Sequence, residues 1–479
     1  MSMVNSAVNL FQGTFTQVLT AVTCTLPMIS DGMQYGWSAP VIPVLQSKDS
    51  PIKVTKKQCE LLESVYIIGA ICGITITIYL VDKIGRKLSL LLAATTTLLV
   101  WVVILTSDNI KYIIAARFFT GMAGDMAFVA APMYLAEIAD QKIRGFLSSI
   151  IYLMMLVGIL VVYIIVPFTP YYVTPVVGIA INAIGIITFA FMPESPYYLL
   201  MKSKTEKAQQ SLIKFRQTKE VEKEFTEIKE AVDKEKSIKT KPLDIVTVKS
   251  NRKGVLIMVV LNGAQHMGCI SIIIMNLHAI LEAAGSIYIE TSYAAIIYSA
   301  IMLLSATTAS FIIDKYGRKL LLLVSNVLTG VCLFVLSTYF YLQHIKVDVI
   351  NVSWIPIASV MVYAAVFKFG LGLVPIVLTA ELFPSNVKAL GMTLSDVMYV
   401  FFAFVSIELY QYLSDNFGMH VPFYVFTVCC FLTAVFTYFY IPETKGKTLE
   451  QIQFLLKGEP IPKRSTDRPE IKYSSVDKV

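Results

Sequence analysis

Asp82–Leu88 reads DKIGRKL, and Asp314–Leu320 reads DKYGRKL. Each copy lies between two long apolar runs, so each predicts a short charged turn that joins two membrane helices. A stretch that recurs in this way indicates two homologous halves. Repeated halves packed against each other are how many solute carriers build a central pathway that opens to either side.

The composition excludes an ordinary soluble domain. Apolar residues make up 56% of the 479 residues and charged residues 15%, with a mean hydropathy of +0.67. We therefore predict an all-α protein with twelve transmembrane helices in two pseudo-symmetric six-helix bundles. The twelve apolar blocks lie near 14–35, 61–81, 88–106, 112–133, 146–167, 173–192, 254–281, 292–313, 319–342, 354–379, 389–413 and 421–441.

The links between these blocks predict the topology. Alternate links are rich in Lys and Arg, which places them and both termini in the cytoplasm. The segment 46–60 is an exception, because it carries four lysines on the side expected to lie outside. No cleavable signal peptide is expected, since the first residues lack a basic region. We expect a multi-pass protein of the plasma membrane that functions as a monomer in the lipid bilayer.

Polar segments divide the chain into four parts. We expect a first six-helix bundle over 1–200, a cytoplasmic linker of short amphipathic helices over 201–253, a second bundle over 254–442 and a cytoplasmic tail over 443–479. The net charge of +7 comes largely from the turns and the linker, so it does not indicate nucleic-acid binding. Most of the seven cysteines lie in apolar blocks and are expected to be core residues rather than a disulfide framework.

The duplication extends beyond the two turns. PMYLAE at 132–137 is echoed by PIVLTAE at 375–381, and PES at 193–195 is echoed by PET at 442–444. At these motifs, and at RFFTG over 117–121 and PETKGKTLE over 442–450, the chain resembles the sugar-porter branch of the major facilitator superfamily. The resemblance covers roughly residues 18–455. GWSAP at 36–40 is also similar to a stretch of the insect facilitated trehalose transporters.

The repeated charged residues predict a gate at the cytoplasmic side. Charge-assisted hydrogen bonds of the turns can pin helix ends together, and the resemblance implies ion pairs that close this side when the carrier faces outward. We expect the acids of each half to reach Arg86 and Arg318 across the bundles. The alternative is static helix capping. Tyr197 stands where the family has Arg, so one arm of the network is missing or rebuilt. The expected gate residues are Asp82, Arg86, Glu137, Arg144, Glu194, Asp314, Arg318, Glu381, Lys388 and Glu443.

The residues expected to bind the solute depart from the family. Sugar sites use amide side chains and an aromatic platform. Here Gln265 is kept, while His266 and Ser271 replace an amide pair, Met275 and Asn276 replace paired tyrosines, and Tyr152 and Met302 stand where two more amides are expected. Ile376 replaces the aromatic platform and Lys368 replaces an acid. The expected solute-binding residues are Gln265, His266, Ser271, Asn276, Tyr152, Lys368 and Ile376.

Each lost hydroxyl contact is worth about 0.5–1.5 kcal/mol. Losing four or five would exceed the few kcal/mol of a millimolar site. Either the replacements build new contacts or glucose is not the substrate; alternatively, His266 and Asn276 merely bond to neighbouring helices. Gly268, Gly370 and Gly372 are expected to let their helices unwind or flex.

Charges inside the apolar blocks are the other signal, because such residues usually face a cavity or a partner. Asp31, Arg117 and Asp125 are candidates for proton coupling, since the resemblance implies an Asp–Arg pair between spans one and four. Asp31 is offset from the family position by about two residues. Lys368 is expected to pair with Asp396 or Glu408.

Taken together, the sequence predicts a carrier that moves a small polar solute, a sugar such as trehalose or a hexose, by alternating-access facilitated diffusion. A proton-coupled symporter, a carrier of a non-sugar solute and a sugar-sensing receptor remain alternatives, although the tail is short for a receptor. No metal cluster, nucleotide loop or nucleophile arrangement indicates an enzyme or a cofactor. Asn351 begins a glycosylation sequon in a predicted outer loop.

Overall fold

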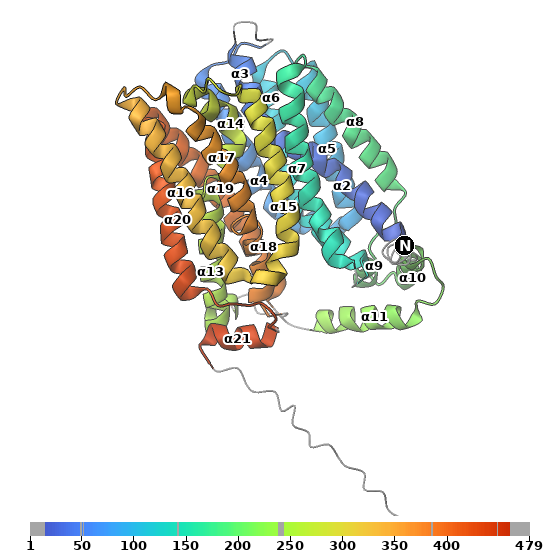
Figure 1. Cartoon of the computed structure of the whole chain (residues 1–479). Helices are drawn as coiled ribbons and strands as arrows, with labels where there is room; N and C mark the ends of the chain where they lie inside the picture. The colour runs from blue at the N-terminus through green and yellow to red at the C-terminus, as the bar shows by residue number, and fades with distance from the viewer. Residues whose placement is uncertain are drawn as a thin grey trace, which may run out of the picture.

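The apolar blocks fold as long helices that run side by side (Figure 1). The structure, a computed structural model, describes residues 15–47, 50, 52–140, 143–237, 244–384, 387–447 and 449–459. Within these ranges the regular elements are helices, with no strand. Eleven of the described helical segments are long and apolar enough to cross a membrane. Helix α2 (Phe15–Gly36) completes the predicted twelve; its buried polar residues account for its lower apolarity.

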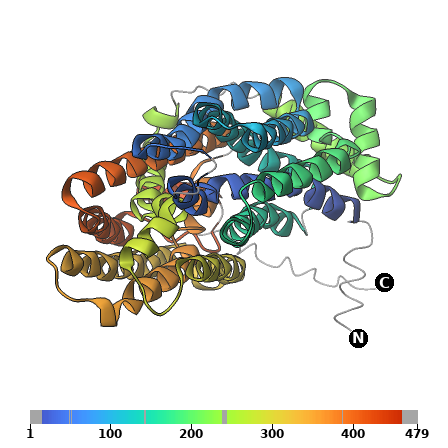
Figure 2. The same ribbon diagram turned by 90° about the horizontal axis from the view of Figure 1, so that it is seen from above.

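The first half contains α2, α4, α5, α6, α7 and α8, and the second half contains α13 to α20. Their bounds are α4 Lys56–Ile84, α5 Arg86–Thr106, α6 Ile110–Ile138, α7 Arg144–Phe168, α8 Val173–Ala190, α13 Lys249–Met267, α14 Ile270–Ala284, α15 Thr291–Tyr316, α16 Arg318–His344, α17 Trp354–Phe369, α18 Val374–Leu382, α19 Lys388–Phe417 and α20 His420–Tyr440. Seen from above, the two halves lie side by side (Figure 2). The chain therefore has the architecture of the major facilitator superfamily.

The two halves use the same helix pairing. In the first half α2 packs on α7, α4 on α6 and α5 on α8, and in the second half α13 packs on α19, α15 on α17 and α16 on α20. The halves meet where α7 packs on α15 and α4 on α19. These two contacts are equivalent under exchange of the halves, so the structure has the approximate two-fold symmetry that the repeated motifs predict.

Glycines permit the closest helix contacts in the first half. A Cβ on Gly32 of α2 would lie 2.0 Å from Met155 O of α7, and one on Gly158 of α7 would lie 1.9 Å from Ile29 O of α2. Without a hydrophobic force between helices in lipid, such small-residue contacts allow the backbones to pack closely. A side chain at either position would force α2 and α7 apart.

Two spans are interrupted, as their glycines predict. The seventh span breaks between α13 and α14 at Gly268–Cys269, and the tenth breaks between α17 and α18 over 370–373. Cys269 has φ 74°, in the left-handed region that favours glycine. The Tyr363 hydroxyl donates to Gly268 O at 2.5 Å, so α17 supports the break in the neighbouring span.

Short helices lie at one end of the molecule, which we call the α9 end. They are α9 (Pro196–Met201), α10 (Thr205–Arg216), α11 (Glu222–Ser237), α12 (Asp244–Thr247) and α21 (Leu449–Lys457). In Figure 1 α9, α10 and α11 lie below the first half and α21 below the second. Arg216 connects α10 to the bundle through Nη1, which donates to Ile138 O at 2.8 Å. The opposite end, the α3 end, carries α3 (Ser38–Gln46).

Candidate functional site

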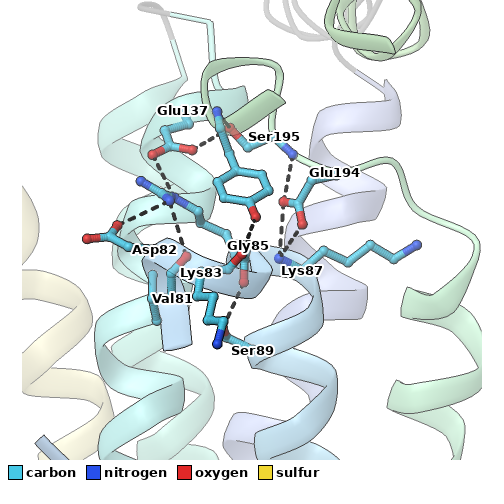
Figure 3. Close-up of polar contacts among 11 residues, drawn as sticks. Val81, Asp82, Lys83, Gly85, Lys87, Ser89, Glu137, Glu194 and Ser195 are labelled. Carbon is cyan, nitrogen blue, oxygen red and sulfur yellow. Dashed lines mark hydrogen bonds and ion pairs between the residues drawn. The ribbon is translucent and has the colours of Figure 1, made fainter. Parts of the chain in front are cut away.

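At the α9 end of the first half, the buried Arg86 is the centre of a polar network. Its partners Val81, Asp82 and Glu137, with Ser195, are labelled in Figure 3. Arg86 Nε donates to Glu137 Oε1 at 3.1 Å, and its Nη1 donates to Val81 O at 3.2 Å. Asp82 Oδ1 lies 3.5 Å from Nη1, and the Ser195 hydroxyl donates to the other oxygen of Glu137. The turn, α6 and the start of α9 are therefore held together around one guanidinium group.

The second half repeats this network with different residues. Arg318 Nη2 donates to Glu381 Oε1 at 3.0 Å, and the Thr444 hydroxyl donates to Glu381 Oε2 at 2.6 Å. Thr444 thus takes the place of Ser195. These two hydroxyl groups belong to the PES and PET repeats. From these repeats, the sequence predicted only the glutamates as gate residues and missed the hydroxyl groups.

The described ion pairs differ from the expectation that these acids reach the arginines across the bundles. Arg86 binds Glu137 and Arg318 binds Glu381, each within its own half. The physical reason is proximity: the turn between the second and third spans of a half lies beside the fourth span of that half. The side chains of Arg144, Asp314 and Lys388 lie outside the described part of the structure.

Glu194 and Glu443 each cap the helix that follows a charged turn. Lys87 N donates to Glu194 Oε1 at 3.1 Å, and Arg318 N and Lys319 N donate to the two oxygens of Glu443 at 3.0 and 3.1 Å. Carboxylates are favourable there because the first N–H groups of a helix lack intrahelical partners. The net pKa shifts of Glu194 and Glu443 have opposite directions. Burial raises the pKa of Glu194. Burial also opposes ionisation of Glu443, but backbone donors, the N–H of Lys445 first, together lower its pKa.

We expect Glu443→Gln to destabilise the folded protein at neutral pH by about 1 kcal/mol, less than a fully buried charged hydrogen bond because water screens the site. The folded pKa of Glu443 lies below its ordinary value of 4.5. Its contribution is therefore present above that value and lost as the pH falls through the folded pKa. Thermal unfolding measured between pH 3.5 and 7 should show the gap from wild type closing on acidification. Glu459→Gln, at an exposed glutamate, is the control, and a pH-independent gap would contradict the capping role.

The central polar residues gather around the two helix breaks. Gln265 Nε2 donates to Leu371 O at 2.8 Å, so it connects the seventh span to the break in the tenth. His266 Nδ1 and the Tyr35 hydroxyl each lie 2.9 Å from Ser271 Oγ, the second contact crossing between the halves. The His266 ring also meets the ring of Tyr399 at 4.3 Å between centroids. The structure thus brings Gln265, His266 and Ser271 together.

Lys368 and Tyr152 meet across the two halves. Lys368 Nζ donates to the Tyr152 hydroxyl and lies 4.8 Å from the centre of the Tyr152 ring. The expected pairing of Lys368 with Asp396 or Glu408 is wrong, since Glu408 accepts from Ser64 Oγ at 2.5 Å and no described carboxylate forms an ion pair with the lysine. A charge at helix mid-depth costs about 2.5–3.5 kcal/mol on insertion scales, so this lysine needs an explanation.

Asn276 and Ile376 lie apart from this group. Asn276 Nδ2 donates to Glu63 Oε2 at 3.2 Å, and Gln411 Nε2 donates to the same oxygen at 3.3 Å. Asn276 therefore bonds to a neighbouring helix, one of the two alternatives that the sequence left open. Ile376 is an exposed position of α18.

Further bonds join the halves toward the α3 end. Lys56 Nζ lies 2.5 Å from Asp415 Oδ1, and the Tyr163 hydroxyl donates to Ile274 O at 2.6 Å. With Glu63, Asn276 and Gln411, these contacts hold the two halves together at this end. Glu63 was missed as a site residue because it stands near the edge of its apolar block, although an acid at that position was itself a signal.

The three candidates for proton coupling do not form the expected pair. Arg117 Nη1 donates to Gln34 O at 2.5 Å and to Gln34 Oε1 at 3.2 Å, and its Nε donates to Leu62 O at 3.3 Å. Asp31 Oδ1 is buried without a hydrogen-bond partner, and Asp125 Oδ2 accepts from the Thr77 hydroxyl at 2.8 Å. The side-chain partner of Arg117 on the first span is an amide.

Comparison with known proteins identifies the family. A family model described as "Sugar (and other) transporter" matches residues 18–456. The chain belongs to this family. It is 26% identical over 448 residues to the facilitated trehalose transporter Tret1 of Drosophila virilis, covering 93% of this chain and 49% of that protein. It is 25% identical to Tret1 of Polypedilum vanderplanki, covering 93% of this chain and 88% of that protein. The chain thus spans about half the length of the Drosophila relative.

Solved structures of the same fold support the architecture. The proton:xylose symporter XylE bound to 6-bromo-6-deoxy-D-glucose superposes with a TM-score of 0.74 at 21% identity, covering 93% of this chain and 100% of that one. An inward-open xylose transporter XylE from E. coli gives a TM-score of 0.75 at 20% identity, covering 91% and 98%. This transporter-family member is therefore a multi-pass membrane protein with the fold of the major facilitator superfamily.

Proposed function

We propose that this chain carries a small polar solute, a sugar in the first instance, across the plasma membrane by facilitated diffusion. One observation supports this proposal above the others. The two halves bond to each other at the α3 end and at mid-depth, whereas the described ion pairs of Arg86 and Arg318 at the α9 end join residues of the same half. A molecule built in this way can rock between two states around a polar centre.

The orientation follows from the charges at the two ends. The DKxGRKL turns lie at the α9 end, and their basic residues favour the cytoplasm. We place both termini in the cytoplasm and Asn351, which is exposed near the α3 end, outside. One chain contains both halves, and therefore a monomer is sufficient for the pathway.

Uniport is preferred over proton symport on the contacts of Arg117. An ion pair that a proton can break requires a carboxylate beside the guanidinium group. The first span supplies Gln34 to Arg117 instead, and Asp31 contributes no bond to it. Uptake by the purified chain in proteoliposomes tests the proposal, with trehalose, glucose, fructose and a polyol each supplied at two external pH values. Absence of saturable uptake of any solute would overturn it, and a strong pH dependence removed by Asp31→Asn would favour symport.

Gln265→Ala should weaken the uptake of whichever solute is carried, while surface expression stays at the wild-type level. The amide bridges the two broken spans through Leu371 O, and its Oε1 stays available to a solute hydroxyl. We expect KM to rise about 5- to 20-fold, the effect of losing one or two hydrogen bonds. Asn416→Ala is the control, because that exposed amide bonds to Tyr412 O of its own helix. Equal KM values for the two variants would show that Gln265 lies outside the site.

A further inference from the structure

Lys368 is a buried cation that neutral-sugar transport does not explain. Only 3% of its surface is exposed. Its ammonium group donates to one neutral hydroxyl, that of Tyr152, and lies near the rings of Tyr152 and Phe367 at 4.8 and 5.7 Å from their centres. A lysine has three N–H donors and a full positive charge, so one hydroxyl leaves most of its binding capacity unused.

The acids at similar depth do not neutralise this charge. Asp125 accepts from Thr77, and Glu408 accepts from Ser64. No ion pair joins Lys368 to Asp396 or to another carboxylate among the described residues. Among the described residues, Lys368 and Arg117 are both buried cations without an ion pair. Carbonyl oxygens of Gln34 and Leu62 accept from Arg117, whereas Lys368 has one hydroxyl.

The position of Lys368 places this charge in the proposed pathway. Its partner Tyr152 belongs to the other half, so a movement of the halves separates the pair. Its side chain runs along the break in the tenth span, where a Cβ on Gly372 would lie 3.0 Å from Lys368 Cδ. Gln265 binds Leu371 O of the same break. A group that bound Lys368 would therefore lie beside the amide proposed to bind hydroxyls.

The backbone at this break adds to the preference for negative charge. Helix α18 begins at Val374, directly after the break. The N–H groups of residues 371–374 are bonded within the protein and Pro375 has none, so the contribution here is the positive end of the helix dipole, which favours an anionic group of a solute. With one lysine available, the charge that the site matches is a single negative charge rather than a phosphate dianion.

We propose that the solute is a small hydroxylated monocarboxylate, a sugar acid, whose carboxylate binds Lys368 in place of the Tyr152 hydroxyl. This inference rests on the proposed carrier function and names its substrate class. Exchange of Tyr152 for the carboxylate releases a contact between the halves, so binding of the solute favours their movement.

The test uses the full chain in proteoliposomes with labelled D-glucuronate, D-glucose and trehalose. We expect kcat/KM for glucuronate to exceed that for either neutral sugar at least about tenfold. Uptake of glucuronate should accelerate when the lumen is made electrically positive, because a monoanion carries charge, and neutral-sugar uptake should not respond. Lys368→Met should reduce glucuronate uptake at least about tenfold, and Lys368→Arg should retain part of it.

Two further variants keep the result interpretable. Tyr152→Phe removes the competing hydroxyl and keeps the ring, so it should lower KM for glucuronate even if Lys368→Met fails to fold. Lys111→Met removes an exposed lysine remote from the site and should leave uptake unchanged. One result would overturn the anion inference and leave the proposed carrier function standing. In that result, a neutral sugar shows saturable uptake, glucuronate does not inhibit it, and neither Lys368→Arg nor Tyr152→Phe changes its rate. Absence of uptake of all three solutes would overturn the proposed function as well.

Discussion

Gly85→Ala and Gly317→Ala should each prevent accumulation of folded protein in the membrane. Both glycines lie in the repeated turns and have positive φ, 104° and 88°, with ψ values of 168° and 162°. This region of backbone conformation is essentially restricted to glycine and costs other residues about 1–3 kcal/mol. A Cβ on Gly85 would also lie 2.5 Å from Glu194 Oε2, and one on Gly317 would lie 2.6 Å from Glu443 Oε2.

The methyl group would therefore act twice, straining the turn and displacing the carboxylate that caps the next helix. We expect a combined loss of about 3–5 kcal/mol, a large part of the stability of a typical fold. Gly285→Ala is the matched control, because Gly285 has φ 62° with no atom within 4 Å of a Cβ. Surface expression and thermal unfolding of the detergent-solubilised protein are the measurements. Expression of Gly85→Ala at the level of Gly285→Ala would contradict the double role of the turn glycine.

The same repeated turns show what the sequence can predict and where it stops. Apolar block length is a local property, and the helices extend only a few residues beyond the predicted blocks. The breaks near Gly268 and Gly370 were also predicted, because glycine marks local backbone freedom. Which charged side chains pair with each other is not a local property. The two halves offer the same residue types, Arg86 and Arg318 with Glu137 and Glu381, and the sequence does not determine whether they bond within or between halves.

The central site was predictable by position and less so by contact. Gln265, His266 and Ser271 come together because they share one helix break. Asn276 lies only five residues beyond Ser271 yet binds Glu63 of the other half, and Lys368 binds a hydroxyl where an acid was expected. These contacts depend on how the halves sit against each other in one conformational state. Departures from the family at Lys368 and Asn276 nevertheless marked both positions as unusual.

Glu63→Ala should shift the protein away from the state with a closed α3 end. The carboxylate is 2% exposed, and its Oε2 accepts from Asn276 Nδ2 at 3.2 Å and from Gln411 Nε2 at 3.3 Å, both on the second half. Hydrogen bonds to a charged group contribute about 1.5–3 kcal/mol each, and the cost of burying the carboxylate offsets part of this. Even a net 1.4 kcal/mol changes the ratio of the two states tenfold.

Labelling of Ser38→Cys measures this shift. Ser38 is fully buried in α3, and its hydroxyl donates to Met275 O across the halves at 3.4 Å. In a background that replaces the exposed Cys72 with Ala, a membrane-impermeant thiol reagent added from the α3 side should react at least about tenfold faster in the Glu63→Ala variant. Glu60→Ala is the control, since the described polar contact of that side chain is a 3.7 Å ion pair with the exposed Lys56. Equal labelling rates in the two variants would show that Glu63 does not stabilise the state with a closed α3 end.

In the Glu63→Ala variant, the apparent KM for transport should change in opposite directions on the two sides of the membrane. A carrier that spends more time open at the α3 end presents its site more often to solute on that side, so the apparent KM for that side should fall. The apparent KM for solute on the α9 side should rise by a similar factor, because the intrinsic affinity of the centre is untouched and only the population of states moves. Opposite changes of the two values would assign Glu63 to the conformational equilibrium, whereas an equal rise on both sides would place it in the binding site.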